Sequence, residues 1–106
     1  MPFFKKDTLE EKKLIPGFRV RFVHGDTMTL AYWTIDKGAK LPEHAHPHEQ
    51  ICNVINGQFE LVIDGEALTL HAGDVGVIPS QAIHAGTALT DCQIIDAFQP
   101  VREDYR

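Results

Sequence analysis

Short stretches of alternating or apolar residues, separated by Gly, Pro and Asp, follow one another along most of this chain. Alternation with a period of two is typical of β-strands with one buried face, and no stretch shows the longer period of an amphipathic helix. The sequence therefore predicts an all-β protein of seven or eight short strands. The runs that indicate them lie at residues 18–24, 27–36, 50–55, 58–63, 66–71, 75–78 and 87–98.

One segment predicts a hairpin by itself. Asp64-Gly65 stands between two strand-like runs, and these residue types supply the positive φ angles of a tight type I′ turn. Further turns are expected at Asn56-Gly57 and at Ala72-Gly73-Asp74. Strands at this spacing indicate an antiparallel sandwich or barrel, and in a chain of 106 residues a small jelly roll closes the sheet edges most economically.

The chain is long enough for one domain and too short for two. Residues 1–17 carry charges of both signs and end at Pro16-Gly17, which predicts an N-terminal arm with at most a short helical turn. Residues 18–106 are expected to form a single barrel domain that includes the C-terminal tail.

Composition argues against several kinds of partner. Ten Lys and Arg residues stand against 15 Asp and Glu residues, the net charge is −5, and there is no basic block, so nucleic-acid binding is not expected. No apolar run reaches membrane-spanning or signal-peptide length, which favours a cytoplasmic protein without membrane contact. Cys52 and Cys92 lie in apolar runs and are expected to be free thiols.

A cluster of histidines follows the loop-like segment 38–42. His44, His46 and His48 fall within five residues, and His84 comes far downstream. Because residues two apart in an extended segment share a face, His44 and His46 can present two imidazoles to one metal ion. His84 could close this site from across a barrel. Nitrogen and oxygen ligands suit Zn, Ni, Fe, Mn or Cu, so the identity of the metal stays open.

The spacing of these residues resembles the two motifs of the cupin superfamily. The first motif is matched by Gly38, His44, His46, Gln50 and Gly57, and the second by Gly73, Pro79 and His84. The resemblance implies a double-stranded β-helix, or jelly-roll, barrel with a short N-terminal arm. It also implies that one divalent transition-metal ion, such as Zn, Ni, Fe or Mn, binds to His44, His46, Gln50 and His84. Small cupins commonly dimerise through sheet edges and an N-terminal arm, so we expect a homodimer.

This chain departs from the usual cupin motifs at three positions. Gln50 replaces a Glu, Gln81 replaces the Gly that follows the motif's Pro, and Ala88 replaces an Asn. Neutral ligands leave the charge of a divalent ion uncompensated, which favours an anionic substrate and argues mildly against iron oxygenase chemistry. The alternative is that the histidines are ordinary barrel residues that bind no metal.

The remaining histidines match no ligand position. We expect His48 to support the site from behind or to be exposed. His24 and His71 lie at strand ends beside small residues and are expected at the surface.

The last predicted strand brings an acid into the interior. Strand parity places Cys92, Ile94, Asp96 and Phe98 on one face, so Asp96 and Phe98 are expected to be buried together. A buried carboxylate needs a balancing charge, which a metal site or Arg102 could supply. The alternative is that Asp96 caps a strand end and Arg102 is solvated on the tail.

The combination of His44-Ala45-His46-Pro47-His48-Glu49-Gln50 with Asp96, Phe98, Arg102 and the following Glu103-Asp104-Tyr105 resembles the KdgF branch of cupins. These are small pectin degradation proteins. The resemblance implies conversion of 4,5-unsaturated monouronates, the products of pectin or alginate lyases, to linear 4-deoxy-5-keto uronates. It implies proton transfer by Asp96, binding of the substrate carboxylate by Arg102 and packing of Phe98 against the sugar ring. Asp96 could act as acid or as base.

Two other functions stay open at this point. A cupin barrel with a metal could be a dioxygenase or a sugar isomerase, which oxygen uptake or a redox-active iron requirement would reveal. It could also be a carbohydrate- or carboxylate-binding protein without turnover, which would return its ligand unchanged.

Overall fold

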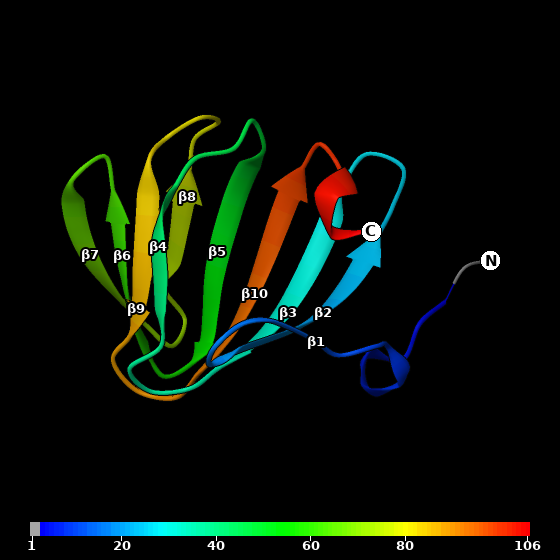
Figure 1. Ribbon diagram of the computed structural model, residues 1–106, viewed down its shortest axis with the longest axis horizontal. Coiled ribbons are helices and arrows are strands. Elements are labelled where there is room, and N and C mark those ends of the chain that lie inside the picture. Colours follow the sequence, from blue (N-terminus) through cyan, green and yellow to red (C-terminus); the bar gives the residue numbers. More distant parts are fainter. Residues whose placement is uncertain (1–2) are drawn as a thin grey trace.

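The computed structural model describes residues 3–106, and strands dominate it (Figure 1). In chain order the elements are the 3₁₀ turn η1 (Lys6–Thr8), strands β1 (Lys12–Ile15), β2 (Phe18–His24), β3 (Thr29–Ile35), β4 (Lys40–His44), β5 (Glu49–Asn56), β6 (Gln58–Ile63), β7 (Glu66–His71), β8 (Val75–Ile78), β9 (His84–Ala88) and β10 (Cys92–Gln99), and the 3₁₀ turn η2 (Glu103–Tyr105). Within residues 3–106, no helix has the length and apolar character needed to cross a bilayer.

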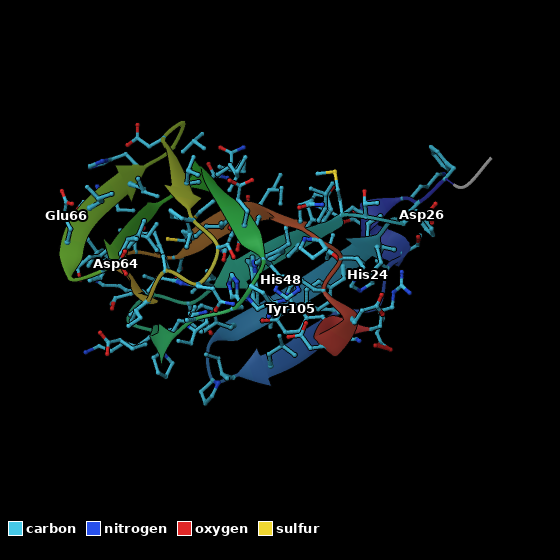
Figure 2. The ribbon with its side chains drawn as sticks, turned by 90° about the horizontal axis from the view of Figure 1, so that it is seen from above. His24, Asp26, His48, Asp64, Glu66 and Tyr105 are labelled. Carbon is cyan, nitrogen blue, oxygen red and sulfur yellow. The ribbon has the colours of Figure 1, made fainter. Side chains whose placement is uncertain are left out.

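The strands form two antiparallel sheets. The larger has the order β1-β2-β3-β10-β5-β8 and the smaller the order β4-β9-β6-β7. The pairs β3–β10, β10–β5, β5–β8, β4–β9 and β9–β6 join strands that are not consecutive in the sequence, so the two sheets form a jelly-roll barrel as predicted. The β6–β7 turn, with Asp64 and Glu66, and the β2–β3 turn, with His24 and Asp26, lie at opposite ends of the molecule (Figure 2).

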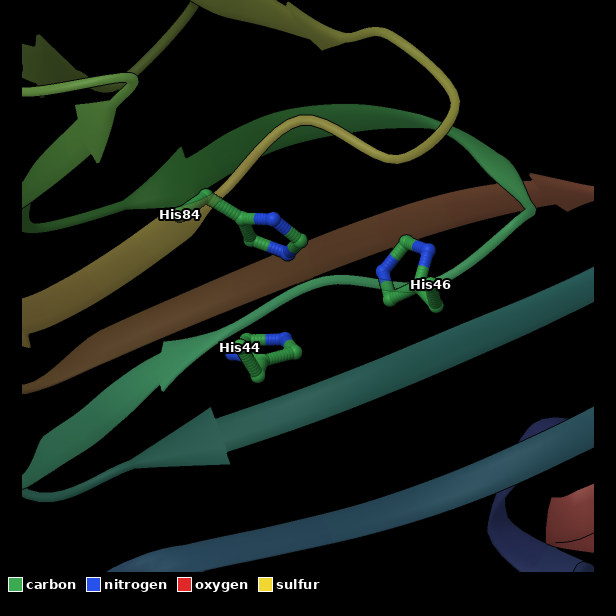
Figure 3. A group of neighbouring side chains, drawn as sticks. All are labelled: His44, His46 and His84. Carbon is green, nitrogen blue, oxygen red and sulfur yellow. The ribbon is translucent and has the colours of Figure 1, made fainter.

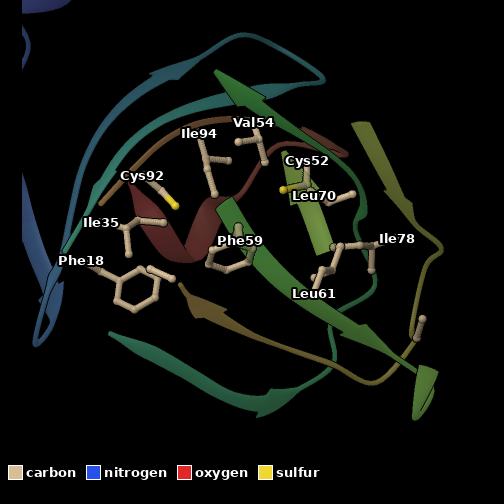
Figure 4. Close-up of a cluster of buried hydrophobic side chains, with 12 residues drawn as sticks. Phe18, Ile35, Cys52, Val54, Phe59, Leu61, Leu70, Ile78, Cys92 and Ile94 are labelled. Carbon is tan, nitrogen blue, oxygen red and sulfur yellow. The ribbon is translucent and has the colours of Figure 1, made fainter. Parts of the chain in front are cut away.

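The core fills the space between the two sheets (Figure 4). Residues alternate between buried and exposed along β5 and β10, which is the signature of strands with one face turned inward. Cys52 and Cys92 are both free and buried, as expected. The main cluster of buried residues consists of Phe18, Ile35, Cys52, Val54, Phe59, Leu61, Leu70, Ile78, Ala82, Ala88, Cys92 and Ile94.

The predicted hairpin is present. Ile63 pairs with Glu66, and Asp64 and Gly65 have φ angles of 48° and 83°. Two positive φ angles in a two-residue loop define the type I′ turn that the Asp-Gly pair predicts.

The N-terminal arm contains a strand that the sequence prediction missed. Strand β1 pairs with β2, and Ile15 lies opposite Phe18, so Pro16 and Gly17 are the central residues of a hairpin turn. Gly17 has a φ angle of 82°, which suits the residue after Pro in such a turn. The expectation of at most a helical turn in this arm was therefore wrong, because Pro16-Gly17 joins two strands. The helical turn itself is present as η1.

Two other strand boundaries differ from prediction. Residues 40–42, expected in a loop, belong to β4, which pairs with β9. The run at 87–98 is not one strand, because Leu89–Asp91 separate β9 from β10. The Thr90 hydroxyl accepts a hydrogen bond from the Gln58 backbone N–H at 3.0 Å, which fixes this turn against β6.

Gly86 in β9 leaves room for an aromatic ring in the core. A Cβ atom built at this position would overlap the ring of Phe59, which packs directly on the Gly86 backbone. Only a residue without a side chain fits there unless the ring moves.

Gly86→Ala should therefore destabilise the protein by about 1–3 kcal/mol through overpacking. Gly25→Ala is the matched control, because the nearest atom to a Cβ at Gly25 is the Met28 carbonyl oxygen at 3.6 Å. Chemical denaturation of both variants measures the difference, and equal stabilities would contradict the packing argument.

Candidate metal centre and active-site cavity

Three histidines converge from three segments of the barrel (Figure 3). His44 is the last residue of β4 and pairs across the sheet with His84, the first residue of β9. His46 lies in the connection between β4 and β5. One ring nitrogen from each residue lies within 4.8 Å of the others. The expectation that His44 and His46 share a strand face was wrong, because the strand ends at His44 and the following loop turns His46 toward the same point.

Each imidazole is oriented by a backbone carbonyl. The Nδ1 atoms of His44, His46 and His84 lie 2.9, 3.0 and 2.9 Å from the carbonyl oxygens of Pro42, His48 and Ala82. A carbonyl oxygen only accepts hydrogen bonds, so each Nδ1 carries the proton and each Nε2 keeps a free lone pair. Such outer hydrogen bonds are the usual way in which metal-binding histidines are oriented.

The donor atoms at the centre suit a cation. The Nε2 atom of His84 is buried and has no hydrogen-bond partner among the described residues. The Gln50 Oε1 atom lies 3.2 Å from the Nε2 atom of His46, so two lone-pair atoms face each other. Exchanging the amide oxygen and nitrogen of Gln50 would pair His46 alone and leave His84 unpaired. His44, His46, Gln50 and His84 could together hold one divalent ion with three nitrogen ligands and one oxygen ligand.

The surroundings favour the neutral forms of His46 and His84. Burial, followed by the Arg102 charge and His84, lowers the pKa of His46 from 6.5 to about 4. Burial also lowers the pKa of His84, against a smaller opposing effect of its hydrogen bond to Ala82. Neutral imidazole is the form that binds metal ions.

Asp96 lies in the barrel interior beside this centre. It occupies the inward face of β10 between Ile94 and Phe98, as strand parity predicted. Burial raises its pKa from 3.8 to about 6, and nearby Gln50, Cys52, Trp33 and Arg102 lower it by smaller amounts. The Oδ1 atom is buried without a hydrogen bond of normal geometry, and so is the neighbouring Trp33 Nε1. This carboxyl group therefore has an oxygen available to a ligand.

Arg102 is buried, and not solvated on the tail. Its guanidinium carbon lies 4.7 Å from the ring centre of Phe98 and 4.0 Å from that of Tyr105. Cation–π contacts with these two rings, whose planes are 76° apart, hold the guanidinium at the end of the barrel. Its charge is paired with Asp104, at 2.8 Å, and not with Asp96.

One cavity connects most of these groups. It has a volume of about 120 Å³ and lies inside the barrel. Six residues of the predicted site line it, namely His44, Gln50, His84, Asp96, Phe98 and Arg102. His46 stands beside it, with its ring centre 4.9 Å from that of His84 and 5.9 Å from that of Phe98. All seven residues predicted from the sequence thus meet in one region.

Comparison with known proteins agrees with this geometry. Residues 31–98 match the family model of the cupin domain. The chain belongs to the cupin superfamily. It is 30% identical over 106 residues to the pectin degradation protein KdgF of Dickeya dadantii, covering 97% of this chain and 96% of that protein. This cupin is therefore KdgF-like.

Solved structures give the same relationship. The structure of KdgF from Halomonas sp. superposes with a TM-score of 0.93 at 31% identity, covering 100% of this chain and 99% of that one. An RmlC-like cupin from Shewanella frigidimarina gives a TM-score of 0.93 at 30% identity, with 98% and 95% covered. The salicylate 1,2-dioxygenase of Pseudoaminobacter salicylatoxidans shares the fold alone, at 20% identity and a TM-score of 0.73, and this chain covers 28% of it.

The remaining histidines of the cupin have distinct surroundings. His48 is half-buried; its carbonyl oxygen lies 3.0 Å from the Nδ1 atom of His46, and its ring lies edge-on to the His46 ring with centres 5.4 Å apart. His71 is exposed and lies 3.6 Å from Asp74, as expected for a surface residue. His24 differs from expectation, because it is half-buried and shares a 2.9 Å hydrogen bond with the Thr29 hydroxyl.

Sequence reasoning did not place several residues of the cavity wall, among them Trp33, Cys52 and Tyr105. Strand parity could have found Trp33, because it shares a face of β3 with the buried Ala31 and Ile35. Tyr105 lies in a 3₁₀ turn after the last strand, where neither strand nor helix periodicity applies.

We expect the purified protein to bind one divalent transition-metal ion per chain. His84→Ala should weaken binding by at least about 10–100-fold, since even the loss of a group that only orients a ligand has an effect of this size. His71→Ala, at an exposed position, is the control. Metal analysis after dialysis, with Ni²⁺ and Zn²⁺ titrations, measures both, and unchanged affinity in His84→Ala would contradict the proposed ligand set.

The pKa of Asp96 predicts a pH-dependent stability. Its folded pKa of about 6 exceeds the ordinary 3.8, so the folded state holds the proton more tightly than the unfolded chain. The contribution of protonated Asp96 to the free energy of unfolding is therefore complete below the unfolded pKa, and it is lost as the pH rises through the folded pKa. In metal-free protein, Asp96→Asn should gain about 2 kcal/mol over wild type between pH 4 and pH 8. Urea denaturation across this range tests it, and parallel pH profiles would refute it.

Proposed function

We propose that this cupin converts a 4,5-unsaturated monouronate, the product of a pectin or alginate lyase, to its linear 4-deoxy-5-keto form. The observation that carries the proposal is one cavity that combines convergent imidazoles with a buried carboxyl group and a buried arginine. The similarity to the pectin degradation protein KdgF supports the same class of substrate.

His44, His46, Gln50 and His84 would hold one divalent ion, such as Zn, Ni, Fe or Mn. A bound ion supplies positive charge that polarises substrate oxygens and orients the sugar. The ligands themselves are neutral, so an anionic uronate is a favourable partner for the centre.

Asp96 is proposed as the proton-transfer residue. The overall conversion is an isomerisation: the C1 hydroxyl group loses a proton, the bond between C1 and the ring oxygen breaks, and C4 gains a proton as the enol becomes a ketone. One carboxyl group that accepts and returns a proton can serve both transfers. The unpaired Oδ1 atom of Asp96 supports this assignment, because protein groups do not already occupy it. The order of the two transfers decides whether Asp96 first acts as base or as acid.

Arg102 and Phe98 are proposed to bind the substrate. The planar guanidinium of Arg102 suits a carboxylate, and both residues line the cavity that Asp96 enters. The Phe98 ring lies on the same inward face of β10 as Asp96, two residues further along, so a sugar beside Asp96 would lie against it.

We expect metal-loaded protein to accelerate the loss of enol absorbance of freshly prepared 4,5-unsaturated galacturonate above its spontaneous rate. Asp96→Asn should lower this catalysed rate by at least about 100-fold, because general acid–base catalysis contributes about 10²–10⁴-fold. Metal content and melting temperature should stay at or above the wild-type values. Asp26→Asn, in the exposed β2–β3 turn, is the matched control.

Other outcomes of this assay identify other functions. Full activity of Asp96→Asn would contradict the proposed role of Asp96. Oxygen uptake with an iron requirement would indicate a dioxygenase. Tight uronate binding with substrate recovered unchanged would indicate a binding protein, and identical rates with and without protein would reject the proposed reaction.

A further inference from the structure

The C-terminal turn η2 carries a carboxylate that is bound to Arg102. The Arg102 Nε and Nη2 atoms donate hydrogen bonds of 3.0 and 2.8 Å to the two carboxylate oxygens of Asp104. This is the paired geometry in which a guanidinium binds a carboxylate most strongly. It occupies one edge of the guanidinium, between Nε and Nη2.

The second edge of the guanidinium, between Nη1 and Nη2, remains available. The Nη1 atom of Arg102 makes no hydrogen bond to any of the described residues. Arg102 lines the cavity, whereas Asp104 does not. The side chain of Asp104 is 55% exposed and that of Arg102 only 6%, so Asp104 approaches from the solvent side. A ligand in the cavity would therefore meet the edge that Asp104 leaves free.

The aromatic contacts and the ion pair constrain the guanidinium in different ways. Its carbon lies 4.7 and 4.0 Å from the centres of the Phe98 and Tyr105 rings, whose planes are 76° apart, so it cannot stack flat on both. The attraction of a cation to a ring face holds the guanidinium in place but does not by itself prevent its rotation. The two hydrogen bonds to Asp104 do prevent it, and they determine which edge is turned toward the cavity.

The turn that holds Asp104 is anchored independently of its side chain. The Arg102 backbone N–H donates to the Thr29 hydroxyl at 2.9 Å, and the Lys12 ammonium donates to the Tyr105 carbonyl at 3.3 Å. The Tyr105 ring also stacks on Phe22, with ring centres 4.7 Å apart. Removing the Asp104 carboxylate should therefore leave the turn in place.

We propose that Asp104 is a positioning residue, which orients Arg102 so that its second edge binds the carboxylate of a uronate. This inference rests on the proposed function for the substrate class, and it adds a residue that sets the affinity for acidic sugars. The opposite physical effect is competition, in which Asp104 occupies Arg102 and the substrate must displace it. Positioning and competition predict changes of affinity in opposite directions when Asp104 is removed.

The test compares Asp104→Asn with Glu103→Gln in metal-loaded protein. Glu103 lies in the same turn, is exposed, and among the described residues its carboxylate pairs with Arg106, so Glu103→Gln removes the same charge without removing a contact to Arg102. Calorimetry with D-galacturonate should show an affinity about tenfold weaker in Asp104→Asn, or about 1.4 kcal/mol, because a guanidinium that is not oriented loses part of its paired hydrogen bonding to the carboxylate. Binding of D-galactose, which lacks the carboxylate, should not change. In turnover, KM should rise while kcat stays within about threefold.

A double-mutant cycle separates positioning from a general structural effect. In the Arg102→Lys background, Asp104→Asn should change galacturonate affinity by less than about twofold, because lysine has no planar edge to orient. Equal effects of Asp104→Asn in both backgrounds would overturn the proposal. Tighter or unchanged galacturonate binding in Asp104→Asn would also overturn it, as would equal effects of the Asp104 and Glu103 variants.

Failure of the reaction is distinguishable from failure of this inference. If the wild type binds galacturonate in an Asp104-dependent way but does not convert the unsaturated uronate, the positioning role stands and the proposed reaction fails. If the wild type converts the unsaturated uronate but Asp104 has no effect on binding, the reaction stands and the positioning role fails. If it does not bind galacturonate, the inference fails as well.

Discussion

Three backbone carbonyl groups determine the chemistry of the barrel interior. The carbonyls of Pro42, His48 and Ala82 each hold one imidazole by its Nδ1 atom, so that the three Nε2 lone pairs converge. Pro42 lies in β4, and His48 and Ala82 lie within two residues of the starts of β5 and β9, so the β-sheet framework sets the ring orientations. Rigid outer hydrogen bonds of this kind are a requirement of a preorganised metal site.

The same framework brings the Asp96 carboxyl group and the Arg102 guanidinium into one small space without pairing them. Asp96 enters from β10 and keeps one oxygen unpaired, while Arg102 stacks above Phe98 and pairs with Asp104 at the barrel end. A direct Asp96–Arg102 ion pair would consume both groups. Pairing Arg102 with Asp104 balances its charge from outside the cavity and leaves Asp96 available to a ligand. An unpaired buried carboxyl group reduces stability, and proteins retain such groups mainly at functional sites.

Much of this arrangement could be predicted from the sequence because it depends on short-range rules. Spacing identified His44, His46, Gln50 and His84, and alternation along the last strand identified Asp96 and Phe98 as inward-facing. These rules fail where the chain leaves regular structure. The loop position of His46 and the hydrogen bonds between Arg102 and Asp104 depend on tertiary contacts.

Strand β1 was missed for a related reason. Pro-Gly is compatible with both the end of an arm and the centre of a hairpin, and only the pairing of Ile15 with Phe18 decides between them. Gln81 shows that a departure from a motif need not change the structure. It stands where the cupin motif has Gly and keeps a φ angle of 66°, so the turn persists without the residue that favours it.

The central claim is that a group of this protein delivers the proton to C4 of a uronate bound in the cavity. Conversion of 4,5-unsaturated galacturonate in D₂O, followed by NMR at early times, tests it most directly. A chiral site that holds the sugar should place deuterium on one face of C4, at a rate above the spontaneous one. Deuterium divided between both faces at the spontaneous rate would contradict the account, because ring opening and protonation would then occur in solution.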